Sequence, residues 1–174
     1  MLFEYQFQPM ITGPQVIEFM DGLFFGLTGK EDLPEIQKCM THVPEVADQI
    51  TAAIADLEKK DLADIIKAIG EIGTIIQNIP TDFQDCQSSS LQNDIARIEK
   101  WGQIFSDPKK LVEVVTMNVL KNYSKILADI GKIPTDFSSG DFKDAGDEVA
   151  DIMVDALGPI PQMDGTWGDV KIQY

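Results

Sequence analysis

Long segments whose apolar residues recur every three or four positions alternate along this chain with short segments rich in proline, glycine and aspartate. That spacing places apolar side chains on one face of an α-helix. In PEVADQITAAIADLE, for example, Val46, Ile50, Ile54 and Leu57 fall on one stripe. The pattern predicts a bundle of about six helices, at residues 15–27, 44–58, 62–76, 91–105, 111–130 and 141–158.

Two of these helices also carry signals about how tightly they pack. The first half of the segment 111–130 is apolar on nearly every side, as in a helix that the core encloses. We therefore predict that it is the most buried helix. In the first helix, Gly22 and Gly26 are four residues apart and would let a neighbouring helix approach closely.

The joints between helices repeat a short pattern. The pentapeptide IPTDF occurs at residues 79–83 and again at 133–137. In each copy proline disfavours continuation of the helix that precedes it. Aspartates such as Asp61, Asp82 and Asp141 then stand where a helix N-cap is expected. We therefore interpret both copies as signals that end one helix, form a turn and start the next, and not as ligand sites. The helices of the bundle are thus predicted to be joined by short Pro- and Asp-capped turns.

The two ends of the chain follow another period. Apolar and polar residues alternate there, which is typical of a half-buried β-strand. The predicted fold class is therefore mainly α with a short strand at each terminus. The predicted organisation is a strand at 1–10, a helical bundle at 11–158, and a Pro/Gly-rich linker with a second strand at 159–174. The apolar residues of these strands are Phe3, Tyr5, Phe7, Val170, Ile172 and Tyr174.

The charge balance limits the kinds of molecule that the protein could bind. The chain has 29 acidic and 14 basic residues and a net charge of −15. Such a surface repels nucleic acids and anionic lipids, and suits cationic partners or weak binding of divalent cations. The longest apolar stretch, 16–27, is too short to span a bilayer and contains Glu18 and Asp21. We predict no membrane span.

Few residues could carry chemistry. The single histidine, His42, lies near Cys39, but a structural zinc site needs about four ligands and a nucleophile needs an orienting base. A calcium loop counted from Asp136 fails, because its sixth and twelfth residues are Asp141 and Asp147 instead of Gly and Glu. We therefore predict no catalytic, cofactor-binding or metal site, and no enzymatic activity.

Two covalent features are candidates for modification. Cys39 and Cys86 could be two free buried thiols or one disulfide that closes a 47-residue loop. We predict the disulfide, since it would tie a short helix to a turn. Asn122 begins the sequon NYS and is the candidate glycosylation site, although it falls inside a predicted helix.

A family resemblance rests on FMDGLFFGL, on AIADLEKKDLADIIKAIGEIG and DFKDAGDEVADIM, and on the cysteines between these blocks. Over residues 16–159 the chain resembles acidic, helix-rich small proteins of uncharacterised role secreted by ciliates and other protists. The resemblance implies an extracellular location or the secretory pathway, and it supplies no catalytic residues. The first ten residues lack the features of a signal peptide, so the cytoplasm is the alternative location.

Two functions fit these patterns. The first is a structural or interaction protein that self-assembles through its terminal strands into a homo-oligomer or a filament, without a cofactor. The alternative is a helical binding module for a small apolar ligand or lipid. The residues predicted to hold that ligand are Phe19, Phe24, Phe25, Ile66 and Ile69.

Overall fold

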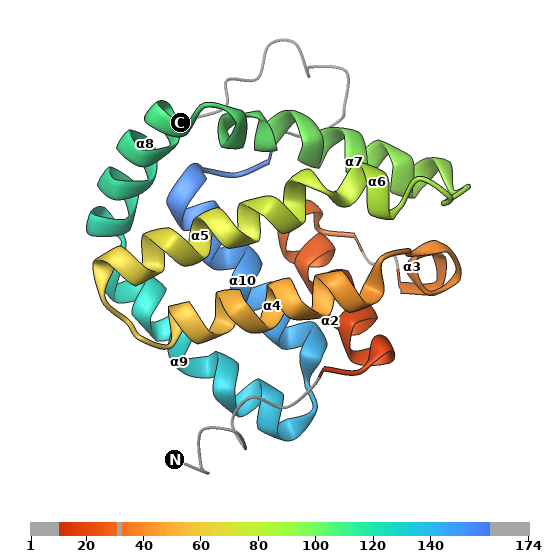
Figure 1. Ribbon diagram of the computed structural model, residues 1–174, viewed down its shortest axis with the longest axis horizontal. Helices are drawn as coiled ribbons and strands as arrows, with labels where there is room; N and C mark the ends of the chain where they lie inside the picture. The colour runs from red at the N-terminus through yellow and green to blue at the C-terminus, as the bar shows by residue number, and fades with distance from the viewer. Residues whose placement is uncertain (1–10, 31–32, 161–174) are drawn as a thin grey trace.

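The computed structural model describes residues 11–30 and 33–160, and all regular structure within these ranges is helical (Figure 1). The described residues form nine α-helices and one 3-10 helix, so the prediction of about six helices was wrong. They contain no β-strand, and the two predicted terminal strands lie outside them. The helices are α2 (Gly13–Thr28), α3 (Leu33–Cys39), α4 (Val43–Leu57), α5 (Leu62–Gln77), α6 (Ile79–Asp82), α7 (Ser89–Trp101), η1 (Gly102–Ser106), α8 (Pro108–Lys121), α9 (Tyr123–Ser139) and α10 (Phe142–Leu157).

Helices α2 and α10 form the most intimate pair of the bundle, and glycines make the close approach possible. A Cβ atom at Gly22 would overlap the backbone carbonyl of Lys143, and one at Gly146 would overlap the carbonyl of Phe19. A Cβ atom at Gly26 would lie 2.5 Å from that of Ala150. The predicted close packing at Gly22 and Gly26 is confirmed, and Gly146 is its counterpart on α10.

Helix α10 ends inside the bundle, where side chains from two other helices bind its last carbonyls. Asn118 Nδ2 donates to the carbonyl of Ala156 at 2.8 Å, and Trp101 Nε1 donates to that of Gly158 at 2.8 Å. Helix C-termini leave carbonyl groups without intrahelical partners, and buried ones must be satisfied by other donors. These contacts therefore fix α7 and α8 against the end of α10.

Two predicted helices are each divided in the structure. The segment 91–105 changes to a 3-10 helix at Gly102, and the segment 111–130 breaks at Asn122 into α8 and α9. At the second break, Asn122 Nδ2 donates to the carbonyl of Asp155 at 3.1 Å. This contact with a residue distant in the sequence has no counterpart in the hydrophobic pattern, which continues through the break.

The second IPTDF segment was wrongly predicted to end a helix. Pro134 lies inside α9, which continues to Ser139 and ends at Gly140 in the left-handed conformation. The first copy fits the prediction better, because α5 ends before it and Pro80 lies in the first turn of the short helix α6. Proline inside a helix removes one backbone hydrogen bond and costs about 3 kcal/mol, so packing of the rest of the helix must offset it. Here Ile133, which precedes Pro134, is fully buried.

The predicted caps have mixed outcomes. Asp61 accepts a hydrogen bond from the backbone N–H of Asp64 at 2.9 Å, as predicted. Asp82 ends α6 and faces His42, so its predicted N-cap role was wrong. Asp141 is the N-cap residue of α10, as predicted, but its side chain makes no capping hydrogen bond. The repeated motif therefore has different local roles at its different positions.

A disulfide joins Cys39, the last residue of α3, to Cys86 in the turn after α6. The Cα atoms of the two cysteines are 5.0 Å apart, within the usual range for a disulfide. The bridge, which confirms the prediction, closes a loop containing α4 and α5. Beside it, Thr41 donates its N–H to the carbonyl of Asp82 at 2.8 Å. The two connections hold the α3–α4 joint against the end of α6.

Candidate functional site

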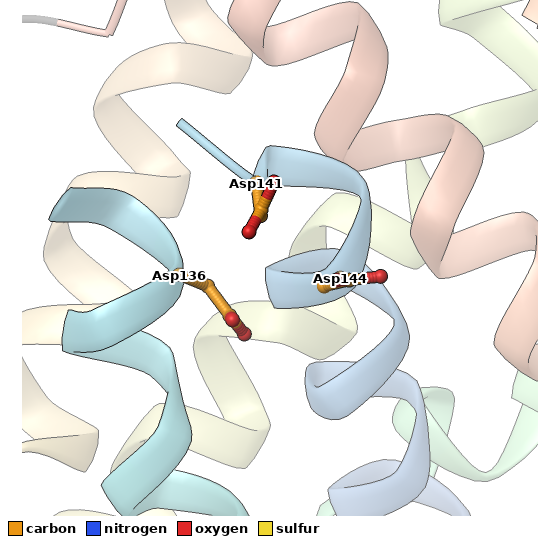
Figure 2. A group of neighbouring side chains, drawn as sticks. All are labelled: Asp136, Asp141 and Asp144. Carbon is orange, nitrogen blue, oxygen red and sulfur yellow. The ribbon is translucent and has the colours of Figure 1, made fainter. Parts of the chain in front are cut away.

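The turn between α9 and α10 gathers acidic side chains from both helices (Figure 2). At this turn the N–H of Asp141 donates to the carbonyl of Asp136, and the N–H of Gly140 donates to that of Phe137. The pair of bonds is a Schellman motif, which lets α10 begin directly after α9 ends. Because the turn is short, the last acid of α9 lies beside the first acids of α10.

We define the acidic patch by the residues Asp136, Asp141, Asp144, Asp147 and Glu148. Carboxylate oxygens of Asp136, Asp141 and Asp144 lie within 4.8 Å of one another. Asp141 and Asp144 are exposed, whereas the other three side chains are half-buried. Figure 2 shows Asp136 reaching from α9 and the other two aspartates it labels standing on the first turn of α10. The positive end of that helix stabilises their negative charges.

Glu148 and Asp136 form a close pair of carboxyl groups within the acidic patch. Burial, and then a hydrogen bond to Asp136, raises the pKa of Glu148 to about 8. Glu148 Oε2 and Asp136 Oδ2 are both buried, and neither has a donor among the described residues. The proton that Glu148 retains supplies the donor that the pair otherwise lacks. Burial likewise raises the pKa of Asp147, with the charge of Asp151 as a second cause.

A similar pair lies between α4 and α5. Burial, and then a hydrogen bond to Asp56, raises the pKa of Glu71 to about 7. The hydrogen bond from Glu71 is also the main reason that the pKa of Asp56 is lowered. This pair has close cations, since Lys59 Nζ is 3.1 Å and Lys67 Nζ is 3.6 Å from the Asp56 carboxylate. It is therefore largely neutralised within the bundle.

The acidic patch can attract cationic groups, but it is not a complete calcium site. Calcium takes six to eight oxygen ligands, and the cluster of Asp136, Asp141 and Asp144 offers one ligand atom from each residue. The remaining ligands of an ion would have to come from water or another molecule. The described residues therefore supply only part of a calcium coordination shell.

A second unusual surface lies on α8, which was wrongly predicted to be the most buried helix. Three large apolar side chains point to solvent: Val112 is 55% exposed, Met117 is 69% exposed and Leu120 is 59% exposed. Lys109 and Lys121, also exposed, flank them. These five residues are the α8 strip. One side of α8 packs on the core through Val114, Val115 and Val119.

Sequence reasoning missed the α8 strip because it treated every apolar residue of the segment as a core residue. A signal was present in the charges. Between Arg97 and Lys125 the chain has six basic and three acidic residues, whereas the whole chain has 14 basic and 29 acidic residues. A groove of about 590 Å³ borders α8, and its lining includes Lys110, Glu113, Met117 and Asp155. The α8 strip is therefore a basic and apolar surface beside a groove, on a protein that is otherwise acidic.

The residues predicted to hold an apolar ligand do not form one cavity wall. Phe19, Phe24 and Ile69 are buried in the core, and Phe24 stacks on Phe83 with ring centroids 5.2 Å apart. Phe25 lies at the surface, where the Lys143 ammonium is 5.0 Å from the centre of its ring. Ile66 is half-buried at the edge of the core. The packing thus uses these side chains to fill the interior.

The structure also shows where the remaining candidate residues His42, Cys39 and Asn122 lie. His42 Nδ1 lies 3.0 Å from Asp82 Oδ1, while Cys39 is in the disulfide and is not a free thiol. Asn122 is half-buried, and the nitrogen that a glycan would modify donates to Asp155. The predicted assembly residues Phe3, Tyr5, Phe7, Val170, Ile172 and Tyr174 all lie outside the described residues.

Of the helices in the described part of the chain, none is long and apolar enough to cross a bilayer. This finding agrees with the prediction of no membrane span.

Comparison with known proteins gives one match. A family profile described as "SctB-like: Secreted protein B-like" matches residues 8–157, which include all the helices described above. No curated protein and no solved structure matches the chain. The disulfide is compatible with an oxidising extracellular environment.

Proposed function

The chain belongs to the SctB-like family of secreted proteins, and we propose that it acts outside the cell as a non-enzymatic structural protein that associates with copies of itself. The observation that carries this proposal is the α8 strip. Large apolar side chains on the surface of a soluble domain are a common mark of interaction sites. The ciliate or protist origin that the resemblance implies is part of the proposal.

Two further features support a structural role. The disulfide and the interhelical contacts at the end of α10 favour a rigid body that persists after secretion. The high net negative charge suppresses unspecific contacts between copies, so that association depends on a defined surface. Weak binding of divalent cations at the acidic patch is a minor part of the same proposal, because its carboxylates are close together.

Sedimentation velocity of the purified oxidised protein over a wide concentration range tests self-association. We expect species larger than one chain that increase with concentration. A single monomeric species at the highest concentration would contradict the proposal. Repeating the run with calcium and with a chelator measures the contribution of cations.

The predicted terminal interface is tested in the same experiment. Deletion variants lacking residues 1–8 or 169–174 should form smaller assemblies if the ends contribute contacts. Unchanged assemblies would assign the association to the helical body. Native mass spectrometry of the same samples checks the alternative function, because a binding module would carry a stoichiometric apolar ligand that organic extraction removes.

A further inference from the structure

We propose that, within the self-association proposed above, the α8 strip of one copy docks on the acidic patch of a second copy, head to tail. The proposal deepens the function by naming the two surfaces that meet. It rests on the opposite charges of the two surfaces, on their separation within one molecule, and on the groove beside α8.

The two surfaces are complementary in charge. The exposed charged residues of α8 are Lys109, Lys110 and Lys121 against one acid, Glu113, so the surface around the α8 strip has a positive balance. Between Asp129 and Asp155, in contrast, the chain has eight acidic residues and two lysines. Complementary potentials of this kind steer association and fix the orientation of partners. The apolar side chains between the lysines supply area that is removed from water on docking.

The two surfaces cannot meet within one molecule. The acidic patch surrounds the start of α10, whereas α8 is held at the other end of α10 by Asn118 and Asn122. A helix of 16 residues is about 24 Å long, far more than a lysine side chain can reach. Figure 1 shows the same separation, with α8 at the upper left and the α9–α10 turn at the bottom. A second copy is therefore needed to bring them together.

Shape also favours this pairing. The α9–α10 turn is a corner whose tip, Gly140 and Asp141, is exposed. The groove beside α8 has a volume of about 590 Å³, and its charged lining residues are Lys110, Glu113 and Asp155, so within the groove only Lys110 can pair with the acidic tip. Because different surfaces of the two copies meet, each bound copy still offers one free surface of each kind to the next. Such heterologous contacts extend into a chain of molecules unless the geometry closes a ring.

An anionic membrane is the other occupant that a basic and apolar helix could suit. The remainder of the molecule disfavours it, because the residues outside Arg97–Lys125 include 26 of the 29 acids and eight of the 14 bases. That excess of negative charge would be repelled by anionic lipid. The same charge attracts the α8 strip of another copy.

The test uses two variants that each disable one surface. The strip variant carries Met117→Ser with Leu120→Ser, and the patch variant carries Asp141→Asn with Asp144→Asn. All four positions are exposed, so we expect both variants to keep the parent's circular dichroism and thermal melting. A control with Ala52→Ser and Asp48→Asn makes comparable changes at exposed positions of α4.

In sedimentation velocity, each variant alone should associate at least about tenfold more weakly than the parent, as when central interface residues are removed. The control should behave like the parent. Mixed in equal amounts, the two variants should form a complex of two chains and nothing larger. In that mixture only the intact strip of the patch variant can bind the intact patch of the strip variant.

Other outcomes overturn the inference, and they separate it from the proposed function. If the parent assembles and both variants assemble equally well, self-association stands but uses other surfaces. If only the strip variant loses association, α8 packs on a surface other than the acidic patch. A parent that stays monomeric and cosediments with phosphatidylglycerol vesicles assigns the α8 strip to membranes. A parent that stays monomeric without binding vesicles refutes both proposals.

Discussion

At the scale of single residues, a glycine, which has no side chain, permits the tightest packing in the bundle. Gly146 on α10 faces α2, and an added Cβ would also lie 2.8 Å from the backbone nitrogen of Leu23. A backbone cannot give way as the end of a flexible side chain can. Gly70, inside α5, has no atom within 4 Å of the position of an added Cβ.

These two glycines make a matched pair of mutations. Gly146→Ala should lower the free energy of unfolding by about 1–3 kcal/mol or more, because it overpacks the α2–α10 contact. Gly70→Ala should raise it by up to about 1 kcal/mol, since alanine favours the helix and has room. Urea denaturation of both variants measures the difference. Equal effects would show that close packing at Gly146 contributes nothing.

The raised pKa of Glu148 predicts a pH dependence. The folded state raises the pKa of Glu148 from 4.5 to about 8, so between these values it keeps a proton that the unfolded chain has lost. The free energy of unfolding should therefore decrease as the pH rises from about 4.5 to about 8. In Glu148→Gln, where the amide donates without titrating, the decrease should be smaller.

Thermal melting of the parent and Glu148→Gln at pH 5 to 8 measures this effect. Glu99→Gln, at an exposed position of α7, is the control and should keep the slope of the parent. Identical slopes for the parent and Glu148→Gln would contradict the raised pKa of Glu148. Glu71→Gln extends the test, because the pKa of Glu71 is raised to about 7.

At the scale of helices, the end of α10 depends on donors from α7 and α8. Asn118→Ala removes the donor to the carbonyl of Ala156 and should lower the free energy of unfolding by about 1–3 kcal/mol. The exposed Asn93→Ala on α7 is the control, and we expect a change within about 0.5 kcal/mol. An equal loss for both variants would mean that this contact is not specific. Hydrogen exchange at the last turn of α10 should also become faster.

The disulfide acts at the same scale, because it joins α3 to the turn after α6. Replacing both cysteines by serine should lower the free energy of unfolding by about 4 kcal/mol in the loop-entropy model for a 47-residue loop. Denaturant unfolding of the parent with and without a reductant gives an independent estimate. The reduced parent should resemble the double serine variant, and stability unaffected by reduction would contradict the prediction.

At the scale of the whole molecule, the distribution of charge matters more than its total. The basic residues near α8 and the acids at the start of α10 lie at two ends of one compact body. A molecule of this kind repels its copies in most orientations and attracts them in a few. The net charge alone would predict repulsion in every orientation.

This segregation predicts a salt dependence. Adding sodium chloride should shift the parent toward monomers, because salt screens exposed charge pairs between copies. Sedimentation at low and high ionic strength checks this, and association through the apolar side chains alone would instead be maintained at high salt. The strip variant should show little remaining dependence.

How far the sequence predicts the structure differs from segment to segment. Helices with an unambiguous stripe, such as 62–76, were predicted nearly to the residue, because periodic burial is a local property. The break at Asn122 and the passage of α9 through Pro134 were not predicted. Both depend on contacts with residues far away in the sequence, which supply bonds and packing that local rules do not include.

The sequence by itself determined the helical class and the close approach at Gly22, because periodicity and small residues act through local geometry. It allowed a disulfide between Cys39 and Cys86, but only the fold brings these two cysteines together. Only the tertiary structure decided which apolar residues face solvent. Val112 and Val115 look alike in the sequence, yet the first is 55% exposed and the second 1% exposed. The physical reason is that burial depends on which neighbouring helices cover a face. The same holds for the acidic patch, whose carboxyl groups interact because a turn brings two helices together.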